Sequence, residues 1–354
     1  MKLKIFLLPL LIFFTLKCNA QFEFHNPAWL TGKSYKKLIV KVGDQSNAYT
    51  QKIMQLFKDN WTVCPVEFYS DKFDKAYLTE GNLFMNFERY TIASQYVRDY
   101  GNNGGRSNGE VSYNDYYYLN FWVLDKKFKP GKDWWDYKFT VARSEFYLKT
   151  IGMGEEEYKM FKIDLETVSG IRKSVYNVQR EEMYPKLFDF TGQDFQFQYL
   201  NGMEGNIRNM IQYINSELLK RSEKDLFSSV KNESELSKLK DAVLFLPNYW
   251  YGEKGTILEN LKDGDKYVKA HADFIKNLKN KYPYKMQVIS RSDLNTKILS
   301  AGEDFYYINY IQSSADKIVS IVNGKTGEVI YSEVTKNSYR IKEKDIEKIA
   351  KAIK

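Results

Sequence analysis

The stretch Leu83-Phe84-Met85-Asn86-Phe87 has a counterpart later in the chain, Tyr306-Tyr307-Ile308-Asn309-Tyr310. Both are runs of large side chains that favour β-strands, and both carry an Asn at the fourth position. Each run follows a strand, a polar segment and a single glycine, which is Gly81 in the first case and Gly302 in the second. We therefore predict that the two runs are one strand of a repeated unit. Their asparagines are interpreted as positions of a sheet rather than as site residues.

The residues around the first run predict a strand, a helix and further strands. Lys37–Val42 and Val66–Tyr69 are predicted strands, and the apolar residues from Ile53 to Trp61 between them recur at helical spacing. Chirality favours a right-handed crossover in which the two strands are parallel. Beyond the run, residues 116–124 and 137–148 predict long antiparallel strands.

The second half repeats this plan. Ala242–Leu246 is a predicted strand, a helix is expected from Asp265 to near Pro283, and Met286–Ser290 matches residues 66–70 in type. The dipeptide Asn323-Gly324 favours a tight hairpin between two later strands. The apolar residues from Ile341 to Ile353 are spaced to bury one side of a final helix.

These patterns predict an α/β (α+β) protein with two related halves. Each half is expected to be a mixed sheet of strand-helix-strand followed by antiparallel strands, with helices mainly on one face. The predicted halves are residues 21–150 and 236–354, joined by a connecting helical region at 151–235. Within that region the apolar stripe from Met203 to Leu218 predicts a helix, and the Lys-, Glu- and Ser-rich segment 220–240 predicts a helix that bridges the halves.

Residues 1–20 have the features of a signal peptide. A basic start is followed by the apolar run Ile5–Leu16, which is shorter than the roughly 20 residues that cross a bilayer, and Cys18-Asn19-Ala20 offers small residues for cleavage. Lys17 disfavours lipidation of Cys18, because lipoprotein signals have a small residue there. We expect export to the periplasm or the cell exterior, with no transmembrane segment in the mature chain. The ending Asn19-Ala20-Gln21 resembles leaders of secreted proteins of Bacteroidetes, particularly flavobacteria.

Composition limits the partners and the redox chemistry. Loss of the three leader lysines lowers the formal charge from +8 to +5, which is mild for a chain of this length and predicts no nucleic-acid partner. Loss of Cys18 leaves Cys64 as the single cysteine, so the mature chain has no internal disulfide and no Cys-x-x-Cys site. Cys64 is interpreted as an inert, buried thiol.

No residue pattern predicts a catalytic, cofactor or metal site. The chain has only two histidines, His25 and His271, and no spacing that suits zinc. A serine triad would need one of these histidines, and no nucleophile elbow is present. Chemistry carried by two carboxylates alone, as in glycosidases, is compatible with the sequence, although nothing marks the pair.

Two aromatic clusters stand beside predicted loops. The first contains Trp134, Trp135 and Tyr137, and the second contains Tyr249, Trp250 and Tyr251. Exposed rings at such positions mark glycan-binding or protein-binding surfaces. Buried rings would instead roof a sheet, because aromatic residues favour strands and their surroundings. Both interpretations remain open from the sequence.

The residues Val319–Ile330, a strand that leads into Asn323-Gly324-Lys325-Thr326-Gly327-Glu328-Val329, resemble the TolB amino-terminal domain and curli-secretion-type periplasmic lipoproteins. Proteins of that group often have an acidic or amide residue followed by Thr-Gly-Glu between two late strands. The resemblance covers about a third of the chain, and the first half departs from it at Asp125-Lys126-Lys127. It implies an envelope binding or scaffold domain without chemistry of its own.

Two functions from different classes follow. The first is a non-enzymatic binding or scaffold protein of the cell envelope, whose partner is an envelope protein or a glycan. The alternative is a carboxylate-based hydrolase that acts on polysaccharide or peptidoglycan in a cleft between the halves. Convergent acids in an aromatic cleft would favour the hydrolase.

Overall fold

A computed structural model describes residues 22–30, 34–70, 75–95, 111–146, 186–188, 202–224, 229–247, 276–313, 316–336, 338 and 341–353. The predicted signal peptide, the aromatic cluster Tyr249, Trp250 and Tyr251, and His271 lie outside the described residues.

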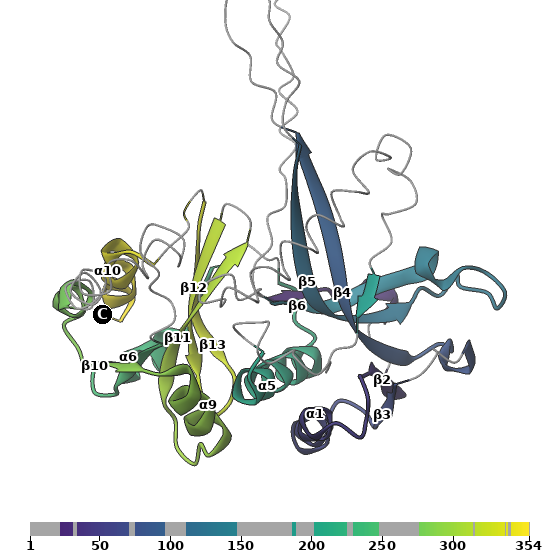
Figure 1. Ribbon diagram of the computed structural model, residues 1–354, viewed down its shortest axis with the longest axis horizontal. Helices are drawn as coiled ribbons and strands as arrows, with labels where there is room; N and C mark the ends of the chain where they lie inside the picture. Colours follow the sequence, from purple (N-terminus) through teal and green to yellow (C-terminus); the bar gives the residue numbers. More distant parts are fainter. Residues whose placement is uncertain are drawn as a thin grey trace, which may run out of the picture.

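Two mixed sheets form the protein, and helix α5 lies between them (Figure 1). The strands of the first half are β1 (Phe22–Phe24), β2 (Lys37–Lys41), β3 (Val66–Tyr69), β4 (Asn82–Gln95), β5 (Val111–Leu124), β6 (Lys138–Phe146) and β7 (Lys186–Phe188). Those of the second half are β8 (Val230–Lys231), β9 (Leu244–Pro247), β10 (Met286–Ile289), β11 (Tyr306–Ser313), β12 (Asp316–Asn323) and β13 (Val329–Thr335).

Helices occur in both halves and between them. The α-helices are α1 (Ala48–Asn60), α5 (Glu204–Lys220), α6 (Glu233–Lys238), α9 (Arg291–Leu299) and α10 (Glu343–Ala352). Residues 276–281 are also helical. Three short 3₁₀ turns are η1 (Ala28–Leu30), η2 (Lys75–Tyr77) and η3 (Trp134–Tyr137).

The two sheets have the same strand order. The first is β3-β2-β4-β5-β6-β1, with β7 beside β4, and the second is β10-β9-β11-β12-β13-β8. In each sheet the first three strands are mutually parallel and the later pairs are antiparallel. The prediction of an α/β protein with two similar halves is therefore confirmed.

The pairing register also agrees between the halves. Leu83 lies opposite Leu38 and Val123, and Tyr306 lies opposite Leu244 and Asn323. With Leu83 and Tyr306 as equivalent positions, the bulge at 121/122 in β5 coincides with the bulge at 321/322 in β12. Asn86 and Asn309 then occupy the same place in their sheets.

One face of each sheet carries helices, which we call the helix face. In the first half Leu83, Met85 and Phe87 pack in one core with Ile53 and Phe57 of α1. In the second half the equivalent strand packs with the helical segment 276–281 and with α10. Successive side chains of a strand point to opposite faces of the sheet, and side chains of a helix return to one side every 3.6 residues. Both periods place the apolar residues on the side that faces the core.

Helix α5 closes the first half in the way that α10 closes the second. Ile207, Ile211 and Ile214 are at most 1% exposed and belong to the core of the first sheet. The same core includes Tyr307 and Val322, which lie on the face of the second sheet opposite to its own helix face. One helix therefore covers the first sheet and joins it to the second.

The predicted bridging helix over 220–240 is wrong, because α5 ends at Lys220. Arg221 adopts a left-handed conformation with φ of 54°, and the backbone N–H groups of Arg221 and Ser222 donate to the carbonyls of Leu218 and Glu217. This cap turns the chain away from the helix axis. The described residues that follow form β8 and the short α6.

Candidate functional site

The first aromatic cluster lies against the face of the first sheet opposite to its helix face, which we call the outer face and on which no described α-helix lies. Trp134 is half-buried, and its ring stacks on Trp122 at a centroid distance of 4.8 Å. Trp122 stacks in turn on Phe84 at 4.2 Å. Tyr137 contacts Phe128 edge-on at 5.7 Å. Trp135 is in the same 3₁₀ turn, but its side chain lies outside the described part of the chain.

A groove lies where the two halves meet. It has a volume of about 450 Å³, within the size range of ligand sites. It is lined by the last turns of α5 and the segment after it, and by β8, the start of α6 and the start of β13 of the second half. The lining residues are Tyr213, Glu217, Lys220, Ser222, Lys224, Val230, Lys231, Asn232, Glu233, Glu328 and Val329. We call this site the junction groove.

Glu217 is the central acid of the junction groove. Its side chain is 3% exposed and forms ion pairs with Lys224 at 2.5 Å and with Lys220 at 3.2 Å. Burial alone would raise the pKa of Glu217, but hydrogen bonds from Lys224 and Ser222 and the charges of the two lysines outweigh it and lower the pKa. The carboxylate is therefore held ionised.

Tyr213 supplies an aromatic wall beside this acid. The ammonium of Lys224 lies 5.3 Å from the ring centroid and donates to the Tyr213 hydroxyl at 3.2 Å. Burial raises the pKa of Tyr213, and the negative charges of Glu217 and Glu328 raise it further. The phenol therefore stays protonated at neutral pH.

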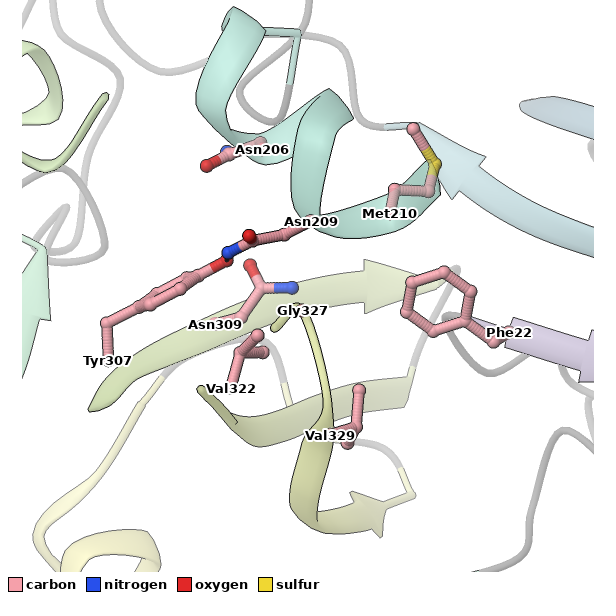
Figure 2. Close-up of a pocket in the computed structure, with 9 residues that line it drawn as sticks. All are labelled: Phe22, Asn206, Asn209, Met210, Tyr307, Asn309, Val322, Gly327 and Val329. Atoms are coloured by element: carbon pink, nitrogen blue, oxygen red, sulfur yellow. Dashed lines mark hydrogen bonds between the residues drawn. The ribbon is translucent and has the colours of Figure 1, made fainter. Parts of the chain in front are cut away.

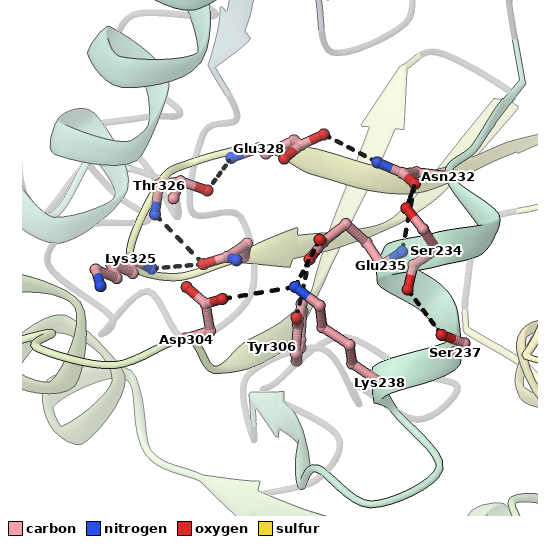
Figure 3. A network of polar contacts seen from close by, with 11 residues as sticks. Asn232, Ser234, Glu235, Ser237, Lys238, Asp304, Tyr306, Lys325, Thr326 and Glu328 are labelled. Atoms are coloured by element: carbon pink, nitrogen blue, oxygen red, sulfur yellow. Dashed lines mark hydrogen bonds and ion pairs between the residues drawn. The ribbon is translucent and has the colours of Figure 1, made fainter.

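The opposite wall belongs to the second half. Asn232 donates from Nδ2 to Glu328 at 3.1 Å, and its Oδ1 caps α6 by accepting from the backbone of Glu235 (Figure 3). Lys231 pairs with Glu233 at 2.9 Å, and both side chains are at least half exposed. The groove thus combines three lysines and three glutamates with almost balanced charge.

A polar network continues from this wall along α6. Glu235 accepts from the Tyr306 hydroxyl at 3.0 Å and pairs with Lys238 at 2.6 Å, and Lys238 also lies 3.9 Å from Asp304 (Figure 3). These contacts fix α6 on β11. Tyr306 is the first residue of β11, the strand equivalent to the one that contains Leu83–Phe87. Through Tyr306 the network therefore fixes the groove wall formed by α6 relative to the second sheet.

The turn 323–328, which carried the resemblance to envelope domains, docks the second half on α5. Asn323 Oδ1 accepts from the backbone of Lys325 and Thr326, which forms the turn. Gly327 has φ of +75°, and a Cβ there would lie 2.1 Å from the carbonyl oxygen of Asn209 in α5. The glycine is required by close approach and by backbone conformation together.

A small cavity lies beside this contact. Figure 2 shows Asn209 and Met210 of α5 facing Tyr307, Asn309 and Val322 of the second sheet. The cavity measures about 20 Å³, enough for roughly one water molecule. Asn209 donates from Nδ2 to the Tyr307 hydroxyl at 3.1 Å, so the pair links α5 to β11.

Glu217 does not have the property that a glycosidase general acid needs. A glycosidase general acid needs a raised pKa, whereas the pKa of Glu217 is lowered. Across the described ranges no cluster of three or more His, Cys, Asp and Glu side chains could hold a metal ion. His25 pairs with Glu23 at 2.9 Å at the edge of the first sheet. The hydrolase stays a prediction.

Sequence reasoning missed the junction groove. Its residues come from segments that are far apart in the chain, and Glu217 belongs to a helix predicted only for its apolar stripe. The available signal was the succession of Glu217, Lys220 and Lys224 at helical spacing, followed by Lys231 and Glu233. Charged residues at such spacing are also usual on the solvent-exposed side of a helix. Only the fold distinguishes a groove lining from such an exposed side.

No helix in the described part of the chain combines the length and apolar character needed to cross a membrane. Comparison of the chain with protein-family models, with curated proteins and with solved structures finds no match.

Proposed function

We propose that the protein is an exported binding or scaffold protein of the cell envelope that holds a polypeptide partner in the junction groove. The observation that supports this is the groove itself, which is open, is large enough for several side chains and is lined by α5 and by the second half. Interfaces between domains are frequent sites of ligand binding. Export is inferred from the leader features in the sequence.

The lining favours a polypeptide over a small apolar ligand. Lys220 and Lys231 have side chains that are 57% and 51% exposed, and Glu233 is 80% exposed. Exposed charges of both signs steer and orient a charged protein surface, although each pair contributes little affinity. Tyr213, with its hydroxyl and apolar ring, is of a type enriched at the centres of interfaces.

The test reverses the charge of the exposed lysines. The mature protein, the double variant Lys220→Glu with Lys231→Glu, and a control double variant are immobilised and exposed to a native envelope extract. The control carries Lys58→Glu and Lys336→Glu, two exposed lysines outside the groove lining. Bound proteins are quantified by mass spectrometry and the strongest is purified for titration.

We expect a partner that the native protein and the control retain equally and that the groove variant loses. Its affinity for the purified native protein should fall steeply with salt, because rim charges act mainly through long-range attraction. Retention of the same proteins by all three immobilised forms would contradict the proposal, and so would a partner whose binding does not depend on the groove lysines.

A further inference from the structure

The outer face of the first sheet contains a buried polar cluster that the junction groove does not use. Asn86 and Asn120 lie directly opposite one another on β4 and β5, and each is 1% exposed. Asn86 Oδ1 accepts from the indole N–H of Trp122 at 3.3 Å, and Asn120 Nδ2 donates to Glu88 at 2.9 Å. These two bonds fix the orientation of both amides.

Each amide has one polar atom without a hydrogen-bond partner. They are Nδ2 of Asn86, which is a donor, and Oδ1 of Asn120, which is an acceptor. Side chains on directly opposed residues of antiparallel strands have Cβ atoms about 5 Å apart. Leaving a buried polar atom without a partner is costly, so an unpartnered donor and an unpartnered acceptor on directly opposed residues point to a group that is bound there.

A hydroxyl group matches this pair of atoms. It accepts a hydrogen bond from Asn86 Nδ2 through its oxygen and donates its proton to Asn120 Oδ1. A carboxylate would meet Asn120 Oδ1 with another acceptor, and an ammonium would meet Asn86 Nδ2 with another donor. A sugar, a water molecule and a Ser, Thr or Tyr side chain all carry hydroxyl groups with this chemistry.

The surroundings favour the sugar. Glu88 forms a buried ion pair with Lys138, and Arg143, which lies opposite Asn120 on β6, pairs with Glu23. The described charges around the cluster therefore balance, which suits a neutral ligand. Beside it the indole of Trp122, tied to Asn86, is sandwiched between Phe84 and the half-buried Trp134. Flat aromatic rings pack against the C–H faces of sugar rings, and adjacent amides take their hydroxyl groups.

The second half provides an internal comparison. Asn309 occupies the position of Asn86, but Ser320 and Val322 replace Asn120 and Trp122. That face is covered by α5. The two amides and the indole therefore occur on the sheet face that no described α-helix covers.

We propose that the outer face of the first sheet binds a neutral sugar, with one hydroxyl bridging Asn86 and Asn120 and with Trp134 at the rim. The site is on the opposite face of the first sheet from α5, so it goes beyond the proposed binding of a polypeptide and does not depend on it.

The test titrates the full mature protein with neutral hexoses, N-acetylhexosamines and their disaccharides up to about 50 mM, which reaches millimolar dissociation constants. Calorimetry and tryptophan fluorescence report binding. The variants are Asn86→Ala, Asn120→Ala and Trp134→Ala, and the matched control is Asn309→Ala. Thermal unfolding establishes that each variant is folded.

We expect at least one sugar to bind. Each folded variant of the three should weaken it by at least about ten-fold, and Asn309→Ala should leave it unchanged. Trp134 is half-buried, so its variant keeps the test valid if an asparagine variant fails to fold. The proposal is overturned if no sugar binds, which leaves water or a hydroxyl side chain as the bridging group, or if a sugar binds the Asn86 and Trp134 variants as tightly as the native protein.

Discussion

The outer face of the first sheet and the equivalent face of the second differ in residue type although they share strand order and register. At four equivalent positions the second face carries a small or aliphatic side chain where the first carries a larger aromatic, polar or charged one. The equivalent pairs are Trp122 and Val322, Glu88 and Ile311, Asn120 and Ser320, and Arg143 and Ser332. Small side chains admit a close helix, and α5 fills that place.

This difference shows how one fold serves two roles. Docking of α5 joins unlike surfaces of the two halves. The second sheet receives α5 on this face, and no described α-helix lies on the equivalent face of the first sheet.

The largest expected effect follows from Gly327→Ala, which attacks the docking of the second half on α5. The new Cβ would lie 2.1 Å from the Asn209 carbonyl oxygen, and the positive φ is unfavourable for alanine. We expect a loss of unfolding free energy on the order of 4 kcal/mol, measured by urea denaturation.

Gly302→Ala is the control for this prediction. Its Cβ would have no atom within 4 Å, and the residue does not have a positive φ in the strained range. We expect a change of less than about 1 kcal/mol. Equal losses in both variants would mean that the turn does not make the close approach to α5.

The second prediction concerns two buried ion pairs of the described residues, one in each half and at non-equivalent positions. Lys317 pairs with Asp345 under α10, with side chains 1% and 7% exposed, and Lys138 pairs with Glu88 under the outer face. Lys317→Met would leave the carboxylate buried without its cation. The expected cost is about 3 kcal/mol.

The control is Lys348→Met, because the ion pair of Lys348 with Glu333 is about one-third exposed. Its loss should cost less than about 1 kcal/mol. If Lys317→Met proved as mild as the control in chemical denaturation, the interior of the second half would be open to water at this pair.

The strands were predictable because their signal is local. Short runs of apolar and strand-forming residues are enough to recognise each strand. They are the runs at 83–87 and 306–310 and the matched segments 66–69 and 286–289. The hairpin between β12 and β13 was predictable for the same reason, but its turn is not the tight Asn323-Gly324 turn. The loop lies between Asn323 and Val329, and its left-handed residue is Gly327.

The role of α5 was not predictable from its own stripe. One apolar stripe explains burial against one sheet, whereas α5 contacts both sheets, bonds the second through Asn209 and approaches α9 at Gly205. Close approach of Gly205 to Asn295 and of Gly327 to Asn209 depends on residues about 90 and 120 positions apart. The junction groove follows from that docking, and for this reason no local pattern marked it.

The third prediction uses pH to examine the junction. The folded pKa of Glu217 is below its ordinary value of 4.5, so the folded state binds this proton less readily than the unfolded state. Its contribution is present above pH 4.5 and is lost as pH falls through the folded pKa. Glu217→Gln should cost about 1–2 kcal/mol at pH 7 and less in acid.

Urea denaturation at pH 7 and at lower pH measures this difference between the native protein and the variant. Glu233→Gln is the control, because its side chain is 80% exposed and should give no pH-dependent difference. If Glu217→Gln cost the same unfolding free energy at low pH as at pH 7, ionisation of the Glu217 carboxylate would not contribute to the stability of the folded protein.

The smallest expected effect distinguishes the ends of the two closing helices. Helix α5 ends at Arg221 with φ of 54°, whereas α10 ends at Ile353 in the ordinary right-handed region. Arg221 also donates to the Leu30 carbonyl at 3.3 Å, which ties the helix end to the first half.

Both Arg221→Ala and Arg221→Gly lose this bond, but only glycine relieves the left-handed strain. We expect the glycine variant to be more stable than the alanine variant by about 1 kcal/mol, or roughly 2–4 °C in melting temperature. An alanine variant as stable as the glycine variant would mean that the left-handed cap does not form, because glycine would then only add entropy to the unfolded chain.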